Sequence, residues 1–142
     1  MPVKRIDQRL AVAAADALPE QVTGDLRTRY RQLRVMLHSA GLAASYAYIA
    51  SKAGDPEAPG LPGAYGKVGY ALKVRLLELR LLSGEADDLG TPEIMRQLGR
   101  MDPVTYARAS AEAAALVSWL SRLATAVAAE NGMPEDEDDG AA

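Results

Sequence analysis

The chain of 142 residues contains no cysteine, no phenylalanine and a single histidine, His38. Without cysteine it has no disulfide framework and no Cys-x-x-Cys pair. One histidine excludes an HExxH motif, and the sequence holds no phosphate-binding loop and no carboxylate pair of suitable spacing. We therefore expect no catalytic residue, no metal site and no cofactor, and we expect His38 to be a surface or core-rim residue.

Long apolar segments are also missing. No run approaches the roughly 18 uninterrupted apolar residues of a membrane span. The first ten residues, MPVKRIDQRL, lack the apolar segment of a secretory signal. These absences predict a cytoplasmic protein that makes no membrane contact.

Aromatic residues amount to six tyrosines and one tryptophan, and β-branched residues are scarce beside alanine, leucine and arginine. This composition favours helices over sheets. No segment alternates between apolar and polar residues over a useful length. Hydrophobic residues make up 49% of the chain, which is enough for one packed core. The predicted fold class is all-α, a compact bundle of five to six helices.

Charge is unevenly distributed along the chain. The net charge is −3, but five of the nineteen acidic residues lie in the C-terminal sequence PEDEDDGAA. Without these five, sixteen cationic residues stand against fourteen acidic ones, a net charge of +2. A block of like charge after a proline is typical of disorder. We predict a single helical domain over residues 1–133 and an acidic, disordered tail over residues 134–142, which either aids solubility or mimics a nucleic-acid strand.

Apolar residues at spacings of three and four, separated by capping and breaking residues, place the helices along the chain. Helices are predicted over residues 3–18, 25–39, 42–52 and 65–82, followed by a short one from residue 91 and a long one over 103–130. Thr23 or Asp25 is expected to cap the second helix, and Gly41 to turn the chain before the third. The sequence GDPEAPGLPG predicts a loop over residues 54–63.

The second predicted helix carries two adjacent stripes when its residues are spaced at about 100°. The apolar stripe consists of Leu26, Tyr30, Leu33 and Leu37, and the cationic stripe of Arg27, Arg31, Arg34 and His38. The arginine stems can cover the rim of the core while their guanidinium groups reach water. Because like charges in one row repel, an anion from elsewhere would stabilise them. Acids of neighbouring helices, plain solvation, a phosphate backbone and an acidic partner surface all stay open as ways to satisfy this row.

Apolar residues surround most of the predicted fourth helix. One stripe holds Val68, Leu72, Leu76 and Leu79, with Lys73 and Arg80 beside it, while Val74, Leu77 and Leu81 lie opposite. Such a helix is either central to the bundle or in contact with another subunit, and we favour the central position. Its sequence GAYGKVG lacks the preceding strand and the Gly-Lys-Ser/Thr order of a phosphate loop. Trp119, in the last helix, is expected in the core and not as a base-stacking platform.

Three segments of the sequence together resemble a known family. They are RIDQRLAVAAADAL near the start, GLAASYAYIASK over residues 41–52 and YARASAEAAALVSWLSRLA over residues 106–124. The second opens on Gly-Leu and ends in Lys52, and the third carries Arg108, Glu112 and an aliphatic run that ends in Trp119-Leu120. This pattern is similar to that of the Cmr small-subunit family of type III-B CRISPR effector complexes.

The resemblance implies a non-catalytic structural subunit that takes part in antiviral defence. It implies copies of the chain stacked in a minor filament, beside the backbone and large subunits, where they line the channel for CRISPR RNA and target RNA. Base pairing then reads the sequence, so the protein needs to contact only the RNA backbone. The candidate contacts are Arg27, Arg31, Arg34, Lys52, Lys73, Arg80, Arg108 and Arg122. The first three are expected to face the channel together.

A function of a different class is also compatible with the sequence. A helical protein-binding adaptor or antitoxin-like module would bind a partner through the fourth helix and use the arginine row for acidic side chains, without RNA contact. Salt distinguishes the two functions. Phosphate contacts make affinity fall steeply as salt rises, whereas an apolar protein interface is far less sensitive.

Overall fold

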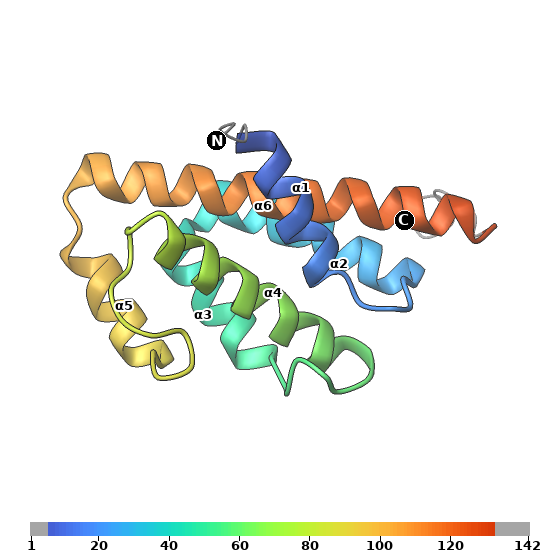
Figure 1. Cartoon of the computed structure of the whole chain (residues 1–142), viewed down its shortest axis with the longest axis horizontal. Helices are drawn as coiled ribbons and strands as arrows, with labels where there is room; N and C mark the ends of the chain where they lie inside the picture. Colours follow the sequence, from blue (N-terminus) through green and yellow to red (C-terminus); the bar gives the residue numbers. More distant parts are fainter. Residues whose placement is uncertain (1–5, 133–142) are drawn as a thin grey trace, which may run out of the picture.

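The computed structural model describes residues 6–132, with side chains described from Gln8 onward. Within this range the chain forms six helices and no strand (Figure 1). They are α1 (Ile6–Ala17), α2 (Gly24–Ala40), α3 (Leu42–Lys52), α4 (Gly60–Glu78), α5 (Thr91–Arg100) and α6 (Pro103–Glu130). The predicted all-α bundle is confirmed. The predicted start of the first helix at residue 3 and the acidic tail over 134–142 lie outside the described residues.

The 28-residue helix α6 runs along the whole long axis of the molecule (Figure 1). Helices α1 and α2 pack most extensively against it, and α3 pairs with α4. The short helix α5 contacts α3 and lies at the end of the molecule where α6 begins (Figure 1). No helix in the described range is long and apolar enough to cross a membrane.

The expected starts of α2 and α6 are confirmed by their caps. The Thr23 hydroxyl accepts a hydrogen bond from the Leu26 amide at 3.0 Å at the start of α2. Asp102 accepts from the Thr105 amide at 2.8 Å at the start of α6, and the backbone and side-chain hydrogen bonds from Thr105 lower the pKa of this carboxyl. Each cap satisfies an amide that has no partner inside its own helix. Gly41 turns the chain between α2 and α3 with a φ of 93°, which a glycine adopts without strain.

The apolar stripe predicted for α2 faces the core. Its members Leu26, Tyr30, Leu33 and Leu37 are each at most 7% exposed. Tyr30 brings a polar atom into this environment, because its hydroxyl is buried without a hydrogen-bond partner among the described residues. Burial raises the pKa of Tyr30, since the charged phenolate would lose its hydration. The stripe therefore anchors α2 in the bundle through shape and apolar area.

The predicted bounds of the fourth helix are wrong at both ends. Helix α4 begins at Gly60, inside the predicted loop, because Pro62 lies in the first turn, where no backbone amide needs an intrahelical partner. It ends at Glu78, four residues earlier than predicted. There the chain closes a turn in which Arg80 adopts a φ of 59°.

The glycines of the sequence GAYGKVG serve close packing. Gly63, Gly66 and Gly69 recur every third residue along α4. A Cβ at Gly63 would overlap the Ala58 carbonyl oxygen, and one at Gly66 would overlap the carbonyl oxygen of Gly54. At Gly69 it would lie 3.3 Å from the side chain of Ile49 on α3. These glycines therefore let α3 and the loop over residues 53–59 approach the backbone of α4.

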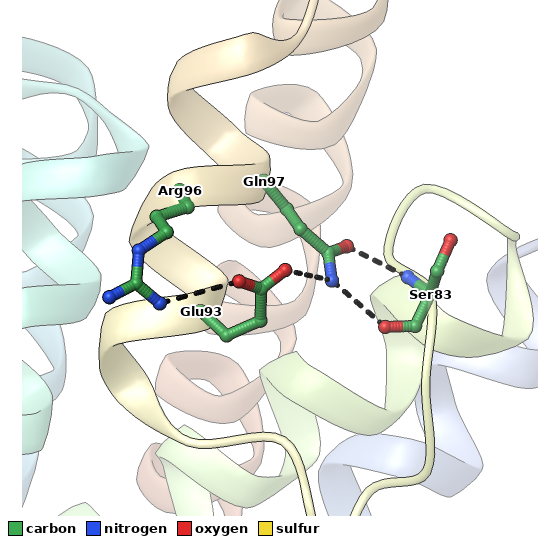
Figure 2. A network of polar contacts seen from close by, with 4 residues as sticks. All are labelled: Ser83, Glu93, Arg96 and Gln97. Atoms are coloured by element: carbon green, nitrogen blue, oxygen red, sulfur yellow. Dashed lines mark hydrogen bonds and ion pairs between the residues drawn. The ribbon is translucent and has the colours of Figure 1, made fainter.

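A polar network fixes the loop between α4 and α5 (Figure 2). The side-chain amide of Gln97 pairs with the backbone of Ser83, accepting from its amide and donating to its carbonyl, both at 2.9 Å. Gln97 also donates to Glu93 at 3.2 Å, and Glu93 accepts from Arg96 at 3.4 Å. The network ties the segment that follows α4 to one face of α5.

The close approach at Gly66 generates a stability prediction. Gly66→Ala should lower the free energy of unfolding by about 2 kcal/mol, because the added methyl overlaps backbone that cannot move without disrupting the loop. Gly99→Ala is the matched control, since this α5 glycine has no atom within 4 Å of an added Cβ. Helix propensity should make that variant about 0.5–1 kcal/mol more stable. Urea unfolding of both variants measures the difference, and an unchanged or raised stability for Gly66→Ala would contradict the packing described.

Candidate nucleic-acid interface

The structure divides the cationic row predicted on α2. Arg34 and His38 are exposed and Arg31 is half-buried, but Arg27 is only 2% exposed. The expectation that Arg27 reaches solvent beside the other arginines is therefore wrong. Arg27 and Arg34 share one face of the helix, and the fold covers that face near Arg27 and leaves it open near Arg34. Helical periodicity predicts which residues share a face of the helix. It does not predict how far along the helix the neighbouring elements bury that face.

Arg27 and Arg31 each have a contact within the protein. The first half of the row therefore interacts with the chain itself. Arg34 is the arginine of this row that faces solvent and for which no carboxylate partner is found within residues 8–132.

Three of the candidate cations lie near aromatic rings. The distances from the charged group to the ring centroid are 5.7 Å for Lys52 and Tyr48, 5.6 Å for Lys73 and Tyr70, and 5.9 Å for Arg122 and Trp119. A cation near a ring face is attracted by the ring quadrupole, which restrains a long, flexible side chain. Trp119 itself is half-buried and packs against the core, as expected from the sequence.

Lys73 differs from the other two because it also has a structural hydrogen bond. Its ammonium group donates to the Leu89 carbonyl at 3.2 Å, and its side chain is partly buried. This bond joins α4 to the end of the loop that precedes α5. Lys73 therefore stabilises the fold, and a ligand would have to compete with the carbonyl for its charge.

Arg80 and Arg108 are exposed, on the turn after α4 and on α6. Among the described residues, ion pairs are found for four other cations, in the pairs Arg29–Asp25, Lys67–Glu57, Arg75–Glu112 and Arg96–Glu93. Five of the candidate residues are exposed and have no carboxylate partner in the described chain. We call them the open cations: Arg34, Lys52, Arg80, Arg108 and Arg122.

A buried ion pair between α4 and α6 was not foreseen from the sequence. Arg75 donates to one carboxylate oxygen of Glu112 through two nitrogens, at 3.3 and 3.0 Å. The side chains are only 4% and 17% exposed, so the pair is well shielded from water. The available signals were one arginine in a largely apolar helix and one acid inside an alanine-rich stretch of another. Nothing in the spacing of the two residues pairs them.

The phenol of Tyr106 on α6 caps α3. Helix α3 begins after Gly41, which has no side chain to accept from the first amides. The Tyr106 hydroxyl accepts from the Ala43 amide at 3.0 Å, across 63 positions of sequence. Two of the segments that carry the family resemblance thus meet in space, because GLAAS supplies the amide and YARAS the phenol.

A groove of about 680 Å³ lies between α1 and α4. Val12 and Tyr70 are among its lining residues and are 56% and 45% exposed. Its charged residues are of both signs, namely Arg9, Lys67 and Arg75 with Asp16, Glu57 and Glu78. The groove therefore does not extend the cationic surface formed by the open cations. Within the described residues, no group of His, Asp and Glu is arranged to hold a metal ion.

The six helices of the described chain make a small all-α protein with exposed cations dispersed over its surface. The model of a family described as CRISPR-associated protein (Cas_Cmr5) matches residues 5–127, most of the chain. The chain belongs to this family and is a CRISPR-associated Cmr-family subunit. No curated protein and no solved structure matches it.

The ion pair between α4 and α6 generates a second stability prediction. Glu112→Leu should lower the free energy of unfolding by about 3 kcal/mol, because it leaves the Arg75 guanidinium buried without its counter-charge. The double variant Arg75→Met/Glu112→Leu should recover most of this loss, since apolar side chains of similar volume replace both charges.

Arg96→Gln is the control for losing an ion pair as such. Its partner contact with Glu93 is at the surface, with side chains 59% and 42% exposed, so the change should cost less than about 0.5 kcal/mol. Thermal or urea unfolding compares the three proteins. A Glu112→Leu variant as stable as Arg96→Gln would show that the buried pair contributes nothing to the fold.

Proposed function

We propose that this chain is a non-catalytic structural subunit that contacts the phosphate backbone of CRISPR RNA or target RNA. Copies of it stack in a minor filament beside the backbone and large subunits of the effector complex. Membership of the CRISPR-associated family supports the setting. The distribution of cations supports the contact, and it is the observation on which the proposal rests.

The open cations are positive charges at the surface that no ion pair of the described chain neutralises. Each is exposed, and for none of them is a carboxylate partner found in the described chain. They are distributed over α2, α3, α6 and the turn after α4. Guanidinium and ammonium groups bind phosphate through charge-assisted hydrogen bonds that do not depend on base identity. A dispersed set of such groups suits a long, uniformly charged strand.

The aromatic side chains near these cations do not form a base-reading surface. Tyr48 and Trp119 are half-buried, and a cation lies near each ring. Tyr48 also packs edge-on against Tyr65, with ring centroids 6.1 Å apart. Rings held in this way do not offer open faces for successive stacked bases. Backbone contact is sufficient in an RNA-guided complex, because base pairing to the guide determines the sequence.

The test compares two triple variants of equal net charge in the assembled complex. Arg34→Gln/Lys52→Gln/Arg122→Gln removes three open cations. Arg29→Gln/Lys67→Gln/Arg96→Gln removes three cations that already have carboxylate partners. Both should fold with near wild-type stability, because exposed charges and ion pairs at the protein surface contribute little to it.

Retention of labelled target RNAs of unrelated sequence is measured at several salt concentrations. The first variant should weaken retention of all of them and reduce the log–log salt slope by about 0.7 for each lost contact, while the second leaves the slope unchanged. Equal slopes for wild type and both variants, with assembly intact, would contradict RNA contact by these residues. That result, together with unchanged RNA retention when Arg80 and Arg108 are replaced, would favour the alternative function, a helical adaptor that binds protein only.

A further inference from the structure

Arg80 occupies a backbone position that suits glycine. The chain leaves α4 through a turn in which the Arg80 amide donates to the Leu77 carbonyl at 3.0 Å and the Leu81 amide to the Leu76 carbonyl at 2.9 Å. This pair of bonds defines the common helix-ending motif whose central residue is left-handed and is usually glycine. Arg80 has a φ of 59° and is the only non-glycine residue with positive φ in the described chain. Its Cβ makes this conformation costly.

Nothing within the described fold accounts for an arginine at this position. The side chain is exposed, and no ion pair or side-chain hydrogen bond of Arg80 is found among residues 8–132. Glycine would complete the same two backbone bonds without strain. A strained residue with no partner in the fold points to a role for its side chain outside the fold.

The ion pair between α4 and α6 relates the position of Arg80 to that of a second exposed arginine, Arg108. Arg75 binds Glu112, and α4 and α6 run in opposite directions along their contact (Figure 1). Arg80 lies five residues after Arg75, and Arg108 lies one helical turn before Glu112. Because the helices are antiparallel, both steps lead to the same side of the ion pair. Arg108 lies about 6 Å from Glu112 along the α6 axis, and Arg80 lies in the turn just past the end of α4.

We propose that Arg80 and Arg108, the seam arginines, form a two-point site for consecutive phosphates of an RNA strand. This proposal rests on the proposed RNA contact and identifies Arg80 and Arg108 as the residues that contribute most to it. A phosphate backbone repeats its charge along the strand, so two guanidinium groups on one edge can each bind a phosphate. The exposed acids Glu85, Asp87 and Asp88 follow Arg80 on the loop, and their charge directs the strand away from the loop, towards α6.

Arg80→Gly tests the site, because strain and binding predict changes of opposite sign. In the full chain, this variant should raise the thermal midpoint by roughly 3 °C, since it removes the strain at the turn. In the assembled complex, it should weaken retention of a fluorescein-labelled target RNA about tenfold at moderate salt. For this assay the target RNA is chosen to be complementary to the guide over only part of its length, so that contacts with protein limit its retention. The salt slope should fall by about 0.7.

Arg108→Gln should reduce the salt slope by a similar amount without stabilising the chain, and the two losses should add in the double variant. Arg96→Gln is the control for removing one exposed cation, because this residue is paired with Glu93 and lies on α5. The proposal would be overturned if the Arg80→Gly variant bound RNA as tightly as the Arg96→Gln control, or if it did not raise the thermal midpoint of the chain. The proposal would also be overturned if the variant impaired assembly of the complex while the complex that does form retained RNA as well as the wild type. That result would indicate an acidic protein partner for Arg80.

Failure of the site formed by Arg80 and Arg108 can be distinguished from failure of the proposed RNA contact as a whole. The triple variant that tests RNA contact leaves both seam arginines intact. If that variant weakens RNA retention and Arg80→Gly does not, the chain contacts RNA elsewhere and the site at the seam is wrong. If neither affects retention, both the function and the site are wrong.

Discussion

The ion pair between Arg75 and Glu112 is the constraint on which the arrangement of α4 and α6 depends. Two charges taken out of water are tolerated only when each satisfies the other, so the pair fixes the register of the two helices. The other features of α4 are built around this register. The α4 glycines admit α3 and its following loop on one side, and the strained turn at Arg80 ends the helix one turn beyond the pair. The register of α4 against α6 therefore sets where the turn that carries Arg80 begins.

The division between hidden and open cations follows from the same packing. Arg75 is satisfied by α6, Arg27 is enclosed by the bundle, and Lys73 holds a loop carbonyl. The open cations lie on α2, α3, α6 and the turn after α4, and no acid partner is found for them in the described chain. A protein that binds a small anion would gather its cations in one pocket. One that lies along a strand gains more from cations spread over its surface, which is the arrangement seen here.

The sequence predicted the elements of this fold far better than their contacts. The helices over residues 42–52 and 103–130, the Thr23 cap and the apolar stripe of α2 follow from local chemistry and periodicity, and the structure reproduces them. The start of α4 was missed because glycine and proline are read as loop formers, although both are tolerated in a first turn. The Arg75–Glu112 pair and the Tyr106 cap join residues 37 and 63 positions apart, and no local pattern specifies them. The burial of Arg27 depends on where neighbouring helices end, which is likewise a property of the assembled bundle.

Arginine-specific chemical modification of the assembled complex tests the central claim most directly. Phenylglyoxal reactivity of each arginine, read by mass spectrometry, is compared with and without bound target RNA. The account predicts that RNA protects Arg80, Arg108 and Arg34. It predicts that Arg96 stays reactive in both states and that the buried Arg27 stays unreactive in both. Equal reactivity of Arg80, Arg108 and Arg34 with and without RNA would contradict the claim that this subunit contacts the RNA backbone.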